Sequence, residues 1–159
     1  LVFIGMFAIF KVYALMWFNI LVSVPVFTIA FILSYNGKFK LAFFMGMLEV
    51  PMHQVLAVLL IGQESSFQIL LFIMIPGSIV AKKWKPMLVL SSLIAFILYL
   101  SILWFDTGQF VMYELSEGTL KFINSVNSLG MFTVVGAILF YYLFLAEKLR
   151  NEIQQTNEK

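Results

Sequence analysis

Residues 41–62 read LAFFMGMLEVPMHQVLAVLLIG, an apolar run whose only ionisable side chains are Glu49 and His53. A transmembrane helix needs about 20 apolar residues, because the hydrocarbon layer is about 30 Å thick and a helix rises 1.5 Å per residue. The run therefore predicts a transmembrane helix that carries a carboxylate and an imidazole inside the membrane.

Other parts of the chain pass the same test of length and composition. The other apolar stretches are residues 13–34, 67–81, 87–105 and 122–145, which gives five spans together with 41–62. The stretch 67–81 is near the lower limit of length for a span. Residues 1–10 are too short to span alone, and we expect them to be the end of a first helix that begins upstream. Only 11% of the residues are charged, against about 25% in soluble domains. The expected fold is all-α, a polytopic six-helix transmembrane bundle with a cytoplasmic C-terminal helix.

The loop charges predict the orientation of the bundle. Cytoplasmic loops are enriched in Lys and Arg. Eight of the ten basic residues fall on one side of the expected topology, and they are Lys38, Lys40, Lys82, Lys83, Lys85, Lys148, Arg150 and Lys159. The opposite side holds Asp106, Glu114 and Glu117, with only Lys11 and Lys121 as basic residues. We therefore expect both ends of the six-helix bundle to be cytoplasmic.

Several classes of site are excluded within these residues. There is no cysteine, so there is no disulfide, zinc–thiolate or iron–sulfur site. One histidine cannot build a multi-histidine metal cage. No phosphate-binding loop, no Ser/His/Asp set and no carboxylate cluster is present, so no catalytic residue is expected here. The short basic loops suit anionic lipid, and no nucleic-acid partner is expected.

Polar residues inside the expected spans gather in the outer half of the bundle, and they are Asn19, Ser23, His53, Gln54, Gln68, Asn124, Asn127 and Ser128. Polar groups in lipid are costly, so each needs a partner or a function. One reading is structural, because amide hydrogen bonds join helices at about 0.6–2 kcal/mol each. The other reading is a polar cavity, open to the outer face, in which a ligand binds.

Glu49 and His53 are four residues apart, so they share a helix face, and Pro51 between them removes a backbone donor. An ionisable pair within the membrane is a functional-site hypothesis by default. The candidates are a ligand or proton site, or a haem site with His53 as an axial ligand and the carboxylate supporting its ring. The structural alternative is a Glu49–His53 hydrogen bond. A bis-histidine haem site would need a second ligand from elsewhere.

The last expected span continues without Gly or Pro after Gly136. A 3-4-3-4 apolar spacing runs through Leu139, Tyr142, Ala146, Leu149, Ile153 and Thr156, which is the pattern of a two-stranded coiled coil. We therefore divide the chain into a transmembrane sensory or anchor domain, 1–145, and the start of a cytoplasmic coiled-coil or transducer helix, 146–159. Leu149 and Ile153 are the expected signal-relay positions.

Residues 48–58, LEVPMHQVLAV, then Gly62 and the SFQ of 66–68, resemble the six-helix membrane anchors of bacterial class III adenylate/guanylate cyclases. The NILVSV of 19–24 is similar to the same anchors, and the LAEKLRNE of 145–152 is similar to their transducer helix. The resemblance implies a homodimer in the bacterial inner membrane, a receptor-like role, and cyclisation of ATP or GTP by a downstream lyase domain. It also implies haem b at His53 as an option.

Other functions stay open at this point. The chain is also suited to the sensory input of a histidine kinase, or to a membrane haem b protein with a redox role. A transporter is disfavoured, because charged residues do not recur across several spans. The expected partners are the lipid bilayer, a second copy of the chain and an unknown hydrophobic or small-molecule ligand. The candidate ligand-binding residues are His53, Glu49, Gln54, Asn19, Gln68, Asn124 and Asn127.

Overall fold

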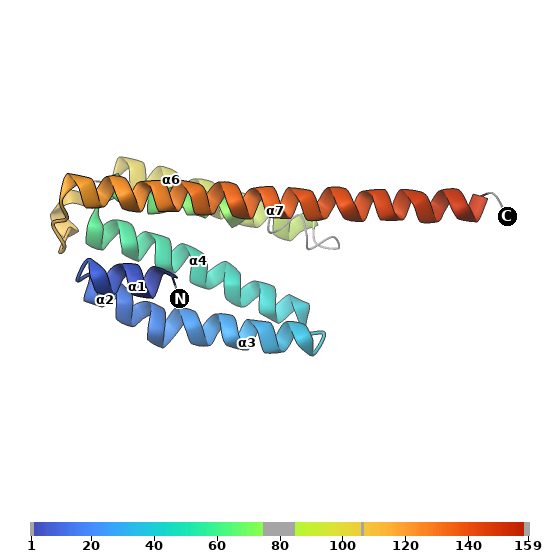
Figure 1. Cartoon of the computed structure of the whole chain (residues 1–159), viewed down its shortest axis with the longest axis horizontal. Coiled ribbons are helices and arrows are strands. Elements are labelled where there is room, and N and C mark those ends of the chain that lie inside the picture. The colour runs from blue at the N-terminus through green and yellow to red at the C-terminus, as the bar shows by residue number, and fades with distance from the viewer. Residues whose placement is uncertain (1, 75–84, 106, 158–159) are drawn as a thin grey trace.

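The structure, a computed structural model, describes residues 2–74, 85–105 and 107–157 (Figure 1). These residues are helical almost throughout and contain no strand, which confirms the expected all-α class. Much of the expected span at 67–81 and the basic residues Lys82 and Lys83 lie outside the described residues. In chain order the elements are α1 (Val2–Ile9), α2 (Tyr13–Phe18), the π-helical η1 (Asn19–Ser23), α3 (Val24–Tyr35), α4 (Phe39–Ile61), the 3₁₀ segments η2 (Gln63–Ser65) and η3 (Phe67–Ile73), α6 (Lys85–Trp104), the 3₁₀ segment η4 (Thr107–Phe110) and α7 (Glu117–Asn157).

Three helical stretches in the described part of the chain are long and apolar enough to cross a membrane. They are Tyr13–Tyr35, which joins α2, η1 and α3, then α4, and Glu117–Gln155 within α7. Their boundaries lie close to the expected 13–34 and 41–62, and α7 runs through and beyond the expected 122–145. The apolar part of α6, Val89–Trp104, is shorter. These findings support a membrane protein with transmembrane helices.

Tight turns connect the N-terminal helices. Lys11, with φ of 60°, reverses the chain after α1, so that α1 and α3 point in opposite directions in Figure 1. Gly37, with φ of 73°, joins α3 to α4, and Gly62, with φ of 104°, ends α4. Glycine adopts positive φ without a steric penalty, which explains why these two positions carry it.

The segment after α4 is an exception to the expected α-helical geometry. Phe67–Ile73 is a 3₁₀ helix, and the backbone N–H of Ile69 bonds to the Ser66 carbonyl at 3.1 Å. Ser66, with φ of 59°, starts this tighter winding. A 3₁₀ helix rises about 2.0 Å per residue, so a short segment covers more depth than an α-helix of equal length. The expectation of an α-helix was therefore wrong for residues 67–73.

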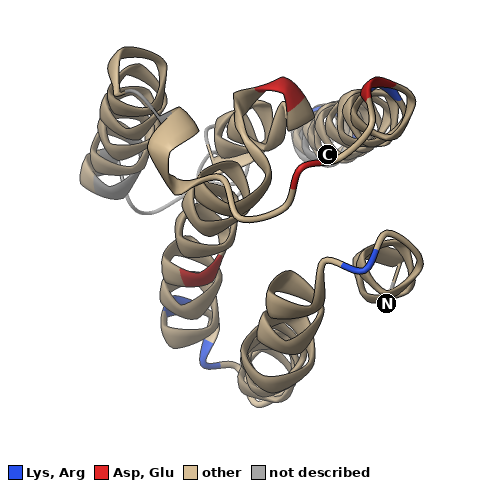
Figure 2. Ribbon diagram, turned by 90° about the vertical axis from the view of Figure 1, so that its left-hand side faces the viewer, with Lys and Arg blue, Asp and Glu red and all other residues tan. Residues whose placement is uncertain are grey.

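The buried core lies where α1, α4, η3 and the first turns of α7 meet. Its fully buried side chains include Phe7, Leu15, Val58, Phe67, Leu71 and Ile123. Large apolar side chains are exposed on the outside of α3, α6 and α7, as expected of surfaces in contact with lipid. In the end-on view of Figure 2, few charged residues lie along the helices.

Candidate functional site

Two hydrogen bonds join η1 to α4 in the interior of the bundle. The Nδ2 atom of Asn19 lies 3.0 Å from Nε2 of His53, and the Ser23 hydroxyl donates to the carboxylate of Glu49. Asn19 and Ser23 are four residues apart, as are Glu49 and His53, and the two helices run antiparallel. The four side chains therefore pair in register, and all four are buried.

This pairing corrects the structural alternative of the sequence analysis. Glu49 and His53 share a face of α4 as expected, but each takes its hydrogen bond from η1 and not from the other. Positions 19 and 23 lie in the π-helical segment η1, and both face α4. Single π turns are frequent at functional sites in helices.

The hydrogen bonds of Asn19 define how the His53 ring is held. Nδ2 of Asn19 also donates to the Leu15 carbonyl at 2.8 Å, and an amide NH₂ has two hydrogens to donate. The second hydrogen points at Nε2 of His53, which therefore acts as the acceptor. The proton of the neutral imidazole is then carried by Nδ1.

Aromatic side chains surround the His53 ring. The ring centroids of Phe3, Phe7, Phe18 and Phe67 lie 6.0, 6.3, 5.8 and 5.9 Å from the imidazole centroid. His53 is only 4% exposed. The ring is thus held in an apolar environment, with its Nε2 directed at a fixed donor.

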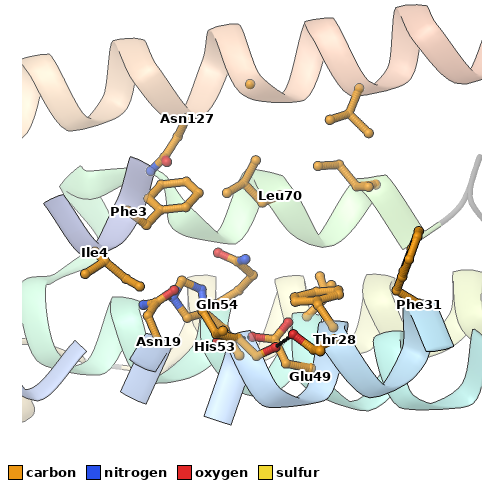
Figure 3. Close-up of a pocket in the computed structure, with 17 residues that line it drawn as sticks. Phe3, Ile4, Asn19, Thr28, Phe31, Glu49, His53, Gln54, Leu70 and Asn127 are labelled. Atoms are coloured by element: carbon orange, nitrogen blue, oxygen red, sulfur yellow. Dashed lines mark hydrogen bonds between the residues drawn. The ribbon is translucent and has the colours of Figure 1, made fainter. Parts of the chain in front are cut away.

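A cavity of about 610 Å³ adjoins these pairs (Figure 3). It lies between α3 and α4 on one side and η3 and α7 on the other, with α1 at one end. The residues that line it are Phe3, Ile4, Asn19, Ser23, Val24, Phe27, Thr28, Phe31, Glu49, Val50, His53, Gln54, Leu70, Ile73, Asn127, Gly130 and Val134.

The cavity brings together five of the seven expected ligand-binding residues, namely Asn19, Glu49, His53, Gln54 and Asn127. The other two, Gln68 and Asn124, do not line it. Gln68 donates to the Gln63 carbonyl at 3.0 Å, and Asn124 accepts from the Ser128 hydroxyl at 3.3 Å. These bonds hold a turn and a helix surface, and Oε1 of Gln68, away from the cavity, is also buried without a partner.

Two oxygens at the cavity wall have no hydrogen-bond partner. They are Oε1 of Gln54 and Oδ1 of Asn127, both on buried side chains. The amide nitrogen of Asn127 donates to the Ser65 carbonyl at 2.9 Å, which leaves its oxygen toward the cavity side of α7 (Figure 3). Buried polar atoms are usually paired, so these two oxygens are the most unusual polar groups of the site.

Sequence reasoning missed the residues that form the apolar walls. Phe3 and Ile4 come from α1, and Phe27 and Phe31 from α3. Gly130 lies three residues after Asn127 on the same face of α7, and this spacing was a usable signal. No pattern in the sequence pointed to α1, because its place in the bundle depends on the turn at Lys11.

The hydrogen bond and the packing of His53 count against a haem iron at its Nε2 atom. Nε2, one of the two possible ligating atoms, already faces the Asn19 amide, and four phenylalanine rings enclose the imidazole. No group of three or more His, Cys, Asp or Glu side chains that could hold a metal ion occurs in the described part of the chain. Haem iron needs only one or two axial ligands, so haem at His53 stays a prediction from sequence, and the absorption spectrum of the purified protein tests it.

The two positions expected from sequence to relay a signal, Leu149 and Ile153, lie away from the cavity, on the far part of α7. Ile153 is exposed there, and the side chain of Leu149 lies outside the described residues. The link between the cavity and these positions is the continuous helix itself.

No protein-family model, curated protein or solved structure matches this chain. Functional inference therefore depends on the residues and geometry of the site.

Proposed function

We propose that the chain is the membrane sensory region of a dimeric signalling protein, and that it relays a signal from the cavity through α7 to a cytoplasmic output domain. The observation that carries the proposal is that one helix joins the two. Asn127, Gly130 and Val134 line the cavity, and the same α7 continues unbroken to Asn157. If α7 has two positions, a molecule that binds the cavity with higher affinity in one of them increases the population of that position.

The proposed output is a class III nucleotide cyclase, on the resemblance of residues 48–58 and 145–152 to the anchors of that family. A histidine kinase output is the alternative, since a six-helix membrane sensor of this kind would serve either output domain. The chain itself contributes no catalytic group in this proposal. The proposed setting is the bacterial inner membrane.

The proposed topology has six spans with the C-terminus in the cytoplasm. It is supported by the three candidate spans and by the loop charges. Glu64 and Lys38 are exposed and lie at opposite ends of α4. A cysteine in place of Glu64 is expected to react with an impermeant thiol reagent added to intact cells, and one in place of Lys38 only after permeabilisation. The reverse labelling would reject the orientation.

The proposed homodimer is formed partly by the second half of α7. Large apolar side chains there, including Leu139, Phe140 and Leu143, are exposed in the single chain. A cysteine at Ile153 is expected to cross-link between copies in high yield, and cysteines at Asn151 and Gln154 in low yield. Equal yields around the helix would argue against a defined seam.

The relay is tested by rotating the end of α7 relative to the cavity through inserted residues. One, two, three, four or seven alanines are inserted after Lys148 in the protein with its output domain, and the product is measured in a strain that lacks its own cyclases. Each residue turns a helix by about 100°. We expect output to vary with the number of inserted residues and to recover with seven, which restore the apolar seam. Output independent of the insertion length would contradict the relay, and phosphotransfer in place of cyclic nucleotide would favour the kinase alternative.

A further inference from the structure

We propose that the cavity binds an organic molecule with an apolar chain and a head group that donates hydrogen bonds, either a primary alcohol or a protonated primary amine. This inference rests on the proposed sensory function and names the ligand class of the same cavity.

The head group is inferred from the acceptors at the cavity wall. Oδ1 of Asn127 and Oε1 of Gln54 accept no hydrogen bond, and their side chains are 0% and 6% exposed, although the Gln54 side chain also interacts with the His53 ring. The carboxylate of Glu49 accepts the hydroxyl of Ser23 and, with four or so lone-pair sites, has acceptor capacity left. A buried acceptor without a partner is unfavourable, so a ligand that donates here is stabilised by satisfying it.

The charge of the lining residues selects against an acidic head. Among them Glu49 is acidic, and there is no Lys or Arg. An anionic ligand would therefore find no cationic partner in this lining. An ammonium gains from the same carboxylate, and a hydroxyl needs only the acceptors.

The rest of the cavity defines the body of the ligand. Much of the remaining lining is apolar and includes Phe27, Phe31, Leu70, Ile73 and Val134. The volume of about 610 Å³ falls in the range of small-molecule sites and far exceeds the roughly 30 Å³ of one water. A single ion or water would leave most of this apolar surface without contact, whereas an alkyl chain would cover it.

The experiment uses the whole protein in nanodiscs of phosphatidylcholine. Dodecylamine, dodecanol and dodecanoate are titrated separately, and the midpoint of thermal unfolding is recorded. A ligand that binds only the folded state raises this midpoint as its concentration rises. We expect a saturable rise with dodecylamine and with dodecanol, and none with dodecanoate.

Two glycines of α7 provide a matched test of location. A Cβ built on Gly130 or on Gly136 meets no atom within 4 Å, but only Gly130 lines the cavity. Gly130→Leu is expected to abolish the rise with both probes, because the side chain occupies the ligand's space. Gly136→Leu changes helix propensity equally and is expected to keep the rise. A rise that is equal in both variants would assign it to the lipid and overturn the proposal.

Two polar variants test the head group. Gln54→Leu is expected to weaken both probes by about ten-fold, because one of the acceptors for the head group is removed. Glu49→Gln is expected to weaken the amine more than the alcohol. A Gln54→Leu protein that is less stable but binds both probes normally would make Gln54 structural only.

The outcomes separate this inference from the proposed function. If neither probe raises the midpoint of the wild type, the ligand class is wrong, whatever the insertions in α7 show. The probes could bind in the cavity while the activity of the output domain changes neither with the probes nor with the insertions in α7. In that case the ligand class stands and the sensory function is rejected. If dodecanoate binds as well as the alcohol, the argument from the charge of the lining residues is rejected.

Discussion

Helices α4 and α7 are both long and apolar, yet they differ in what surrounds them. In α4 the buried share of the most apolar 18 residues is 44%, and in α7 it is zero. Helix α4 places its polar side chains against η1, whereas α7 joins the bundle through its first turns, at Ile123 and Asn127. The difference indicates that α4 is held by packing inside one chain, and that most of α7 is available for lipid or a second chain.

The largest effect is expected from matched phenylalanines. Phe67 is fully buried against the His53 ring, and Phe140 on α7 is 73% exposed. Phe67→Ala is expected to lower the free energy of unfolding by about 3–5 kcal/mol. Phe140→Ala is expected to change it by less than about 0.5 kcal/mol in the monomer. Reversible unfolding in mixed micelles measures both, and similar losses would remove the contrast between the two regions.

The next effect concerns His53. Replacing it with Ala leaves a buried Asn19 donor without its partner, and the expected loss is about 1–3 kcal/mol. Leu48 on the same helix is 51% exposed, so Leu48→Ala serves as the control with a small loss. If the two variants unfold alike, the Asn19–His53 contact does not stabilise the bundle.

Double-mutant cycles sharpen the description of α4. We expect coupling energies of about 0.6–2 kcal/mol for Asn19 with His53 and for Ser23 with Glu49. The crossed pairs, Asn19 with Glu49 and Ser23 with His53, are expected to couple by less than about 0.5 kcal/mol, because they share no hydrogen bond. Strong crossed coupling would mean that all four groups act as one network.

The smallest effect tests the backbone and is the same in both helices. Gly46 in α4 and Gly136 in α7 each have no atom within 4 Å of a built Cβ. Gly46→Ala and Gly136→Ala are each expected to stabilise the protein by about 0.5–1 kcal/mol, since Gly is unfavourable inside a helix. A gain at Gly46 alone would indicate that α7 is not helical at Gly136 in the isolated chain.

The long helices were predictable from the sequence, whereas their polar partners were not. Length and composition alone placed 13–34 and 41–62 within about two residues, because both are dictated by the thickness of the membrane. The common face of Glu49 and His53 followed from helical spacing. Their partners on η1 did not, since a π turn changes the register and gives no signal in composition. The apolar walls from α1 likewise depend on a turn at Lys11, where the chain adopts a positive φ at a residue type that does not signal it.

Because α7 is long, a small tilt near the cavity produces a large displacement at its far end. A helix of 41 residues is about 60 Å long, twice the thickness of the hydrocarbon layer. The distance along it from Gly130, at the cavity, to Asn157 is about 40 Å. A tilt of about 5° around the cavity would therefore displace the far end by roughly 3.5 Å, more than half the 5.4 Å pitch of a helix. A sub-ångström change one helical turn away from Gly130 would thus be amplified into a displacement of several ångströms at Asn157.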